Sequence, residues 1–143
     1  MTSRPHATTT RLPDEIRPVM ESGVPVVLVT CSAAGEPNVA VVSQAYYVDA
    51  ESVAVSFQFF SKTIHNVREN PRATICLHDV WHGRRWLLDV RYDHSETEGP
   101  VFDRLDLEIE AIASATGMSG IFKLRSADIY KVVSVEWVPC QAE

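Results

Sequence analysis

Short runs of β-branched and other apolar residues, separated by turn residues, recur along most of the chain. Runs of this kind predict strands. Six strands are expected, over residues 24–32, 38–48, 52–60, 72–78, 85–92 and 127–138. Only a few residues separate the first strand from the second and the second from the third. These three strands are therefore expected to pair as an antiparallel meander.

Three other segments have the pattern of helices. Residues 12–22 and 61–70 predict short helices, and the second should stop at Asn70 because Pro71 disfavours the helical conformation before it. A longer helix is expected over residues 101–115, whose apolar residues recur at the spacing of one helix face: Val101, Leu105, Ile109 and Ile112. Together the elements predict a mainly β fold with flanking helices, a small closed or nearly closed antiparallel barrel.

The composition limits the class of protein. A chain of 143 residues with 45% hydrophobic and 22% charged residues fits one domain, expected over residues 12–143 after a flexible lead-in, residues 1–11. No apolar run approaches the roughly 20 residues that span a membrane. The net charge of −6 argues against a nucleic-acid partner. Three widely spaced cysteines without a Cys-x-x-Cys pair predict reduced thiols and a cytoplasmic location.

Ser61, Lys62 and Thr63, where the third strand runs into a helix, are the main candidate for a binding site. Ser61 is a good helix N-cap, and the unpaired amides at a helix start favour an anion. Lys62 adds a full positive charge, so a phosphate group fits this position. The alternative is an ordinary helix start with a solvated lysine, which spacing alone favours.

The order of these pieces resembles the pyridoxamine 5'-phosphate oxidase-like, FMN-binding split-barrel superfamily. Two strands precede the strand that ends at Ser61-Lys62, and a short helix, an Asn70-Pro71-Arg72 stop and further strands follow, over about residues 12–138. The resemblance implies a six-stranded antiparallel split β-barrel. It also implies FMN as the cofactor, with Ser61, Lys62 and Thr63 at its phosphate, in a homodimer that holds the cofactor at the subunit interface.

The resemblance further implies contacts with the flavin ring, many of them from main-chain groups. The matching positions lie on the second and third strands and on the fifth: Val41, Ser43, Gln44, Ser56, Phe57 and Trp86. Trp86 belongs to a stretch rich in aromatic and cationic residues, and the alternative for it is a tryptophan packed on the barrel rim.

The sequence departs from the name-giving oxidases in two places. The arginine that supplements their phosphate site falls at about Val41, so a cation is missing there. Their Arg-x-His arrangement near the C-terminus has no counterpart in residues 135–139. Pyridoxamine phosphate is therefore not the expected substrate.

The function that follows is an FMN-dependent oxidoreductase acting on a small molecule, with NAD(P)H as a candidate donor. No catalytic residue is named, because flavin hydride transfer needs no protein acid or base. Two alternatives stay open. One is a non-catalytic flavin- or haem-binding module, in which His65 is a candidate axial ligand. The other is a deazaflavin-dependent reductase.

Overall fold

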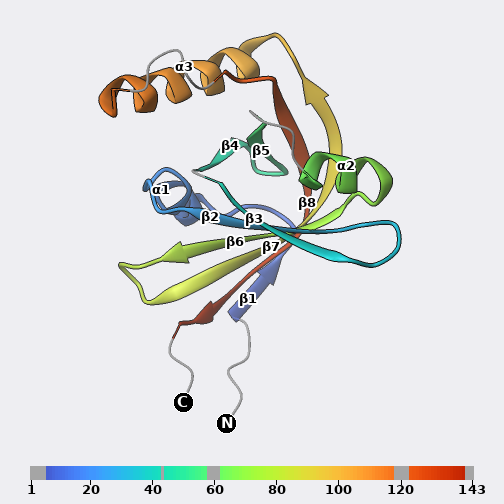
Figure 1. The fold of residues 1–143 in the computed structure, drawn as a ribbon. Helices are drawn as coiled ribbons and strands as arrows, with labels where there is room; N and C mark the ends of the chain where they lie inside the picture. Colours follow the sequence, from blue (N-terminus) through green and yellow to red (C-terminus); the bar gives the residue numbers. More distant parts are fainter. Residues whose placement is uncertain (1–5, 43, 58–61, 118–122, 141–143) are drawn as a thin grey trace.

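The computed structural model describes residues 6–42, 44–57, 62–117 and 123–140. In this part of the chain an 8-stranded sheet has the order β3-β2-β6-β7-β8-β5-β4, with β1 beside β8 (Figure 1). The strands are β1 His6–Thr9, β2 Val26–Cys31, β3 Pro37–Val42, β4 Ala45–Asp49, β5 Ser52–Phe57, β6 Arg72–Asp79, β7 Arg84–Glu96 and β8 Ser126–Pro139. The helices are η1 Asp14–Ile16, α1 Arg17–Met20, α2 Lys62–Glu69 and α3 Pro100–Ala115.

The expected fold class, mainly β and antiparallel with flanking helices, is confirmed. Every strand pair is antiparallel. The expected number of six strands is exceeded in two places. The single strand expected over residues 38–48 is divided into β3, which pairs with β2, and β4, which pairs with β5. The three expected strands are therefore two hairpins and not one continuous meander.

The second difference lies in the expected lead-in, residues 1–11. His6–Thr9 forms strand β1 along the C-terminal half of β8, with His6 opposite Trp137 and Thr9 opposite Val135. Pairing with a strand more than 100 residues away supplies backbone hydrogen bonds that no local pattern predicts. Residues 1–5 lie outside the described part of the chain.

The core divides into two clusters on opposite faces of β8. Tyr130 packs with the barrel interior, which includes Leu28, Ile75 and Leu88 from three neighbouring strands. Ile129, the preceding residue, packs instead under α3, which lies over β4 and β5 in Figure 1. This alternation is what a strand covered on both faces requires. None of the described helices is long and apolar enough to cross a membrane.

The outer face of the β2–β3 pair leaves apolar side chains uncovered. Val39 and Val41, which alternate with inward residues of β3, are 64% and 68% exposed. Val27 and Val29 on β2 stand opposite Val41 and Val39 and are half-buried. Together these four valines form one apolar patch on the surface, which we call the valine patch.

Candidate functional site

The helix start predicted to bind phosphate is formed by α2. Lys62, its first residue, is exposed and makes no ion pair with a described residue, whereas Thr63 and the apolar Ile64 and Val67 are buried. Ser61 lies outside the described residues. The two placed members of the expected site therefore have different surroundings: Lys62 extends into solvent, and Thr63 faces the sheet.

Two hydrogen bonds between side chains join the buried face of α2 to the sheet. The Nδ2 group of Asn38 on β3 donates to Thr63 Oγ1 over 3.1 Å. The Nδ2 group of Asn66 donates to Thr30 Oγ1 on β2 over 3.3 Å. Thr30 and Asn38 are directly opposite in the β2–β3 pair, while Thr63 and Asn66 are three residues apart on one helix face. We refer to these four residues as the α2 anchor.

Asn66 is the most deeply buried member of the α2 anchor. It is 1% exposed, and its Oδ1 atom has no hydrogen-bond partner among the described residues. Sequence reasoning missed this anchor. The signal was an asparagine within a strand, where asparagine is depleted, and a second one on the helix face that also carries Ile64 and Val67.

The residues expected to contact a flavin ring are not all placed together. Val41 faces outward from β3, on the opposite side from Asn38, and Gln44 is half-buried between β3 and β4. Ser56 is half-buried on β5. Phe57 ends that strand opposite Ser126, and Ser43 lies outside the described residues.

Trp86 does not line a surface with these residues. It is 2% exposed, belongs to the barrel core and stands opposite Leu77 on β6. Leu77 is four residues along the strand from Ala73, which pairs with Thr30 in the α2 anchor. At about 3.3 Å per residue, the four-residue offset places Trp86 about 13 Å from the α2 anchor along the strand direction. Trp86 is therefore a core residue in this structure, and its contact with a flavin ring stays a prediction.

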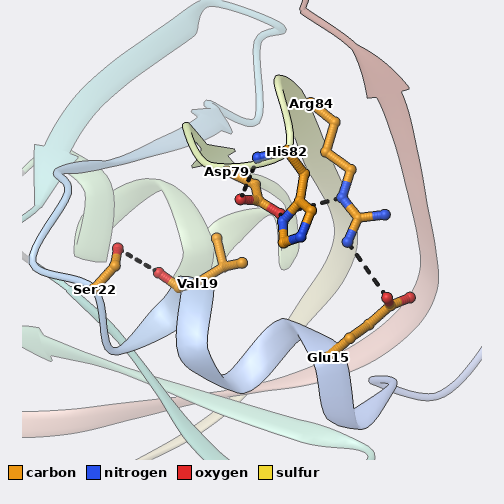
Figure 2. Close-up of polar contacts among 6 residues, drawn as sticks. All are labelled: Glu15, Val19, Ser22, Asp79, His82 and Arg84. Atoms are coloured by element: carbon orange, nitrogen blue, oxygen red, sulfur yellow. Dashed lines mark hydrogen bonds and ion pairs between the residues drawn. The ribbon is translucent and has the colours of Figure 1, made fainter.

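Trp86 instead helps hold Arg84 at the other end of the barrel. The Arg84 guanidinium lies 4.7 Å from the Trp86 ring centroid and 4.8 Å from that of Trp137. Its Nε atom donates to Asp79 Oδ2 over 3.1 Å, and Nη2 lies 3.3 Å from Glu15 Oε2 (Figure 2). Arg84 therefore links the β6–β7 turn to η1, and its contacts stabilise the fold.

Asp79 is the buried centre of this link. Burial by itself raises the pKa of Asp79, but hydrogen bonds from His82 and Arg84 outweigh it and hold the pKa below its usual range. His82 contributes through its backbone amide and through Nδ1, which lies 2.8 Å from Asp79 Oδ2 (Figure 2). On the neighbouring helix, the Ser22 hydroxyl donates to the Val19 carbonyl and closes α1.

A second buried carboxylate lies near the start of β8. Asp128 Oδ1 accepts hydrogen bonds from Ser95 over 2.7 Å and from Ser126 over 2.8 Å. Tyr92 donates to the Ser95 hydroxyl, whose own proton points to Asp128. Burial raises the pKa of Asp128, and the serine hydroxyls and the charge of Arg68 only partly oppose this.

Replacing Asp128 by asparagine should stabilise the protein at neutral pH. Because the folded-state pKa is raised, the folded chain binds more protons than the unfolded chain between the unfolded value of about 3.9 and the folded one. The contribution of Asp128 to stability therefore falls as pH rises through that window, and Asp128→Asn should remove this contribution to the pH dependence. Chemical unfolding at pH 3.5 and pH 7 measures this, with the exposed Asp103→Asn as control. A variant that is less stable than wild type at pH 7 would contradict the argument.

A sequence model described as pyridoxamine 5'-phosphate oxidase matches residues 12–132. The chain belongs to this family. The match covers β2 to β7, all four described helices and the first half of β8, so Lys62 and the α2 anchor both lie within it. No curated protein matches the chain in sequence.

Solved structures of the same fold are dissimilar in sequence. An FMN-binding protein from Syntrophomonas wolfei has a TM-score of 0.73 and 17% identity, over 91% of this chain and 86% of that one. HutZ, the haem storage protein from Vibrio cholerae, has a TM-score of 0.56 and 18% identity, over 92% of both chains. An F₄₂₀ reductase has a TM-score of 0.59 and 14% identity, over 88% of this chain and 98% of that one. At such identities the likeness establishes the split-barrel fold of this family.

Proposed function

We propose that this protein binds FMN with the cofactor's phosphate at the start of α2 and acts as a flavin-dependent oxidoreductase on a small molecule. The observation that carries the proposal is the exposed Lys62 at the first position of a helix whose next residue is fixed to the sheet. An anion placed there would meet a full positive charge and the amides of the first helical turn.

The residues present fit a phosphate monoester. Lys62 is not neutralised by a carboxylate of the described residues, and Arg68, at the other end of α2, is the next cation on this helix. Val41 offers no charge on β3, so Lys62 supplies most of the electrostatic attraction. The FMN-binding neighbour from Syntrophomonas wolfei supports this choice of cofactor.

We propose that the protein forms a homodimer in which the second subunit completes the cofactor cleft. The valine patch supports this, since an exposed apolar surface of neighbouring strands marks an interaction surface. Val41 belongs both to this patch and to the positions expected at the flavin ring. A second copy that covers the patch would therefore exclude water from one side of the cofactor.

Flavin would supply the hydride chemistry itself. The chain's own contribution is to bind and orient the cofactor through Lys62, the amides of the first turn of α2 and the main chain near Gln44 and Ser56. The substrate is proposed as a small molecule, and NAD(P)H as a candidate donor.

Lys62→Ala should weaken FMN binding by about 10–150-fold, because a hydrogen bond to a charged group contributes about 1.5–3 kcal/mol. Riboflavin, which lacks the phosphate, should bind wild type and variant equally. Fluorescence titration with both ligands measures the two constants. Lys123→Ala, which removes an exposed lysine just before β8, controls for net charge and should leave both constants unchanged. Wild-type FMN affinity in Lys62→Ala would refute the phosphate assignment.

The absorbance spectrum of the purified protein separates this proposal from its alternatives. A flavin spectrum bleached by NADH or NADPH supports the oxidoreductase. A flavin that neither donor bleaches supports a binding module, and a Soret band supports a haem protein. The F₄₂₀ reductase and haem storage neighbours make these alternatives concrete, although they share only the fold with this chain.

A further inference from the structure

The α2 anchor joins a helix to the sheet through directional contacts. Its two hydrogen bonds join one cross-strand pair, Thr30 and Asn38, to one helix face, Thr63 and Asn66. The apolar contacts of Ile64 and Val67 already hold the helix against the core. Apolar contact is non-directional, so it resists separation of helix and sheet much more than sliding or rotation.

Directional hydrogen bonds restrict those remaining movements. Asn38 donates to Thr63, the residue after Lys62, so the contact acts within the first turn of α2. Asn66 and Thr30, which are 1% and 2% exposed, fix a second point three residues further along. Two points on one helix face define both its position along the axis and its rotation.

We propose that Asn38 and Asn66 are positioning residues that set where Lys62 and the first amides of α2 meet the cofactor's phosphate. The inference rests on the proposed function. Binding groups must be held within about 0.5 Å of the productive geometry, and a site at a helix start depends on where the whole helix lies. Asn38 contacts Thr63, whereas Lys62 is the side chain proposed to contact the phosphate. Asn38 therefore acts on the ligand through the position of the helix.

Asn38→Ala should raise the dissociation constant for FMN roughly 3–10-fold, the worth of one neutral hydrogen bond. The dissociation constant for riboflavin should stay within twofold of wild type, because only the phosphate end is displaced. The FMN-to-riboflavin affinity ratio is the decisive readout. An equal loss of affinity for FMN and for riboflavin would show a general loosening of the fold and would overturn the inference.

A double-mutant cycle with Thr63→Val tests whether the effect passes through the Asn38–Thr63 contact. If it does, the double variant should bind FMN no more weakly than the weaker single variant. Effects that multiply would overturn the proposed route. Thr63→Ser, which keeps the hydroxyl acceptor, should retain the wild-type ratio.

Asn70→Ala is the matched control at the opposite end of α2. Asn70 Oδ1 accepts a hydrogen bond from the Arg72 amide over 3.3 Å, a local contact beyond the end of the helix. Its replacement should leave the FMN-to-riboflavin ratio unchanged. If Lys62→Ala lowers FMN affinity and Asn38→Ala does not, only the positioning role fails. If Lys62→Ala has no effect, the proposed phosphate site fails as well.

Discussion

Arg84→Ala should lower the free energy of unfolding by about 3–5 kcal/mol, the usual cost of removing one partner from a buried ion pair. The Asp79 side chain is 1% exposed and that of Arg84 is 13% exposed. The variant would leave the carboxylate with His82 as its remaining partner among the described residues and would remove the contacts of the guanidinium with the Trp86 and Trp137 rings. Urea unfolding at pH 7 measures the loss.

The loss should depend on pH in a defined direction. Because the folded-state pKa of Asp79 is lowered, its stabilising contribution is present above the unfolded value of about 3.9 and is lost as pH falls through the folded value. Below that window Asp79 is neutral in both the folded and the unfolded state. The difference in free energy of unfolding between wild type and Arg84→Ala should therefore shrink. A difference that grows on acidification would contradict this account of the ion pair.

Arg85→Ala is the matched control for this experiment. Arg85 is the next residue of β7, but it is exposed and faces the opposite side of the sheet. Its replacement should change stability by less than about 0.5 kcal/mol. Arg84→Lys should be intermediate, because lysine keeps the charge but lacks the planar fork that bonds Asp79 and stacks on the rings.

The strands could be predicted from the sequence because their signals are local. Alternation and β-branched residues marked β2 and β6 to within about two residues and the start of β5, whose expected end at residues 58–60 lies outside the described part of the chain. The helical spacing of Val101, Leu105 and Ile109 marked α3. Strand β1 could not be predicted, since its four residues, His-Ala-Thr-Thr, are stabilised by a partner strand far away in sequence.

The candidate site divides in the same way. Lys62 at a helix start was predictable from the strand, the cap and the proline stop. The α2 anchor was not, because its contacts join residues 25 and 36 positions apart. For Trp86, the sequence left a surface and a packed position equally open. Only the pairing of β7 with β6 and β8 shows that this indole belongs to the core.

The substitutions Val39→Lys and Val41→Lys together should convert the proposed homodimer to monomers. A two-fold interface contains each patch twice, so the double variant would place four lysines in or beside one apolar contact. An unpaired buried charge costs several kcal/mol, and we expect the dimer dissociation constant to rise more than about 1000-fold. Both side chains already lie outside the core, so the folded monomer should survive.

Sedimentation velocity of wild type and variant measures the change in mass, and FMN titration of the same samples measures the cofactor site. If the partner completes the cleft, FMN affinity should fall when the variant loses the ability to dimerise. Leu107→Lys is the control, since Leu107 is 74% exposed on α3, away from the valine patch. A wild-type monomer that binds FMN would refute the dimeric cleft. A variant that stays dimeric would show that the interface lies elsewhere on the molecule.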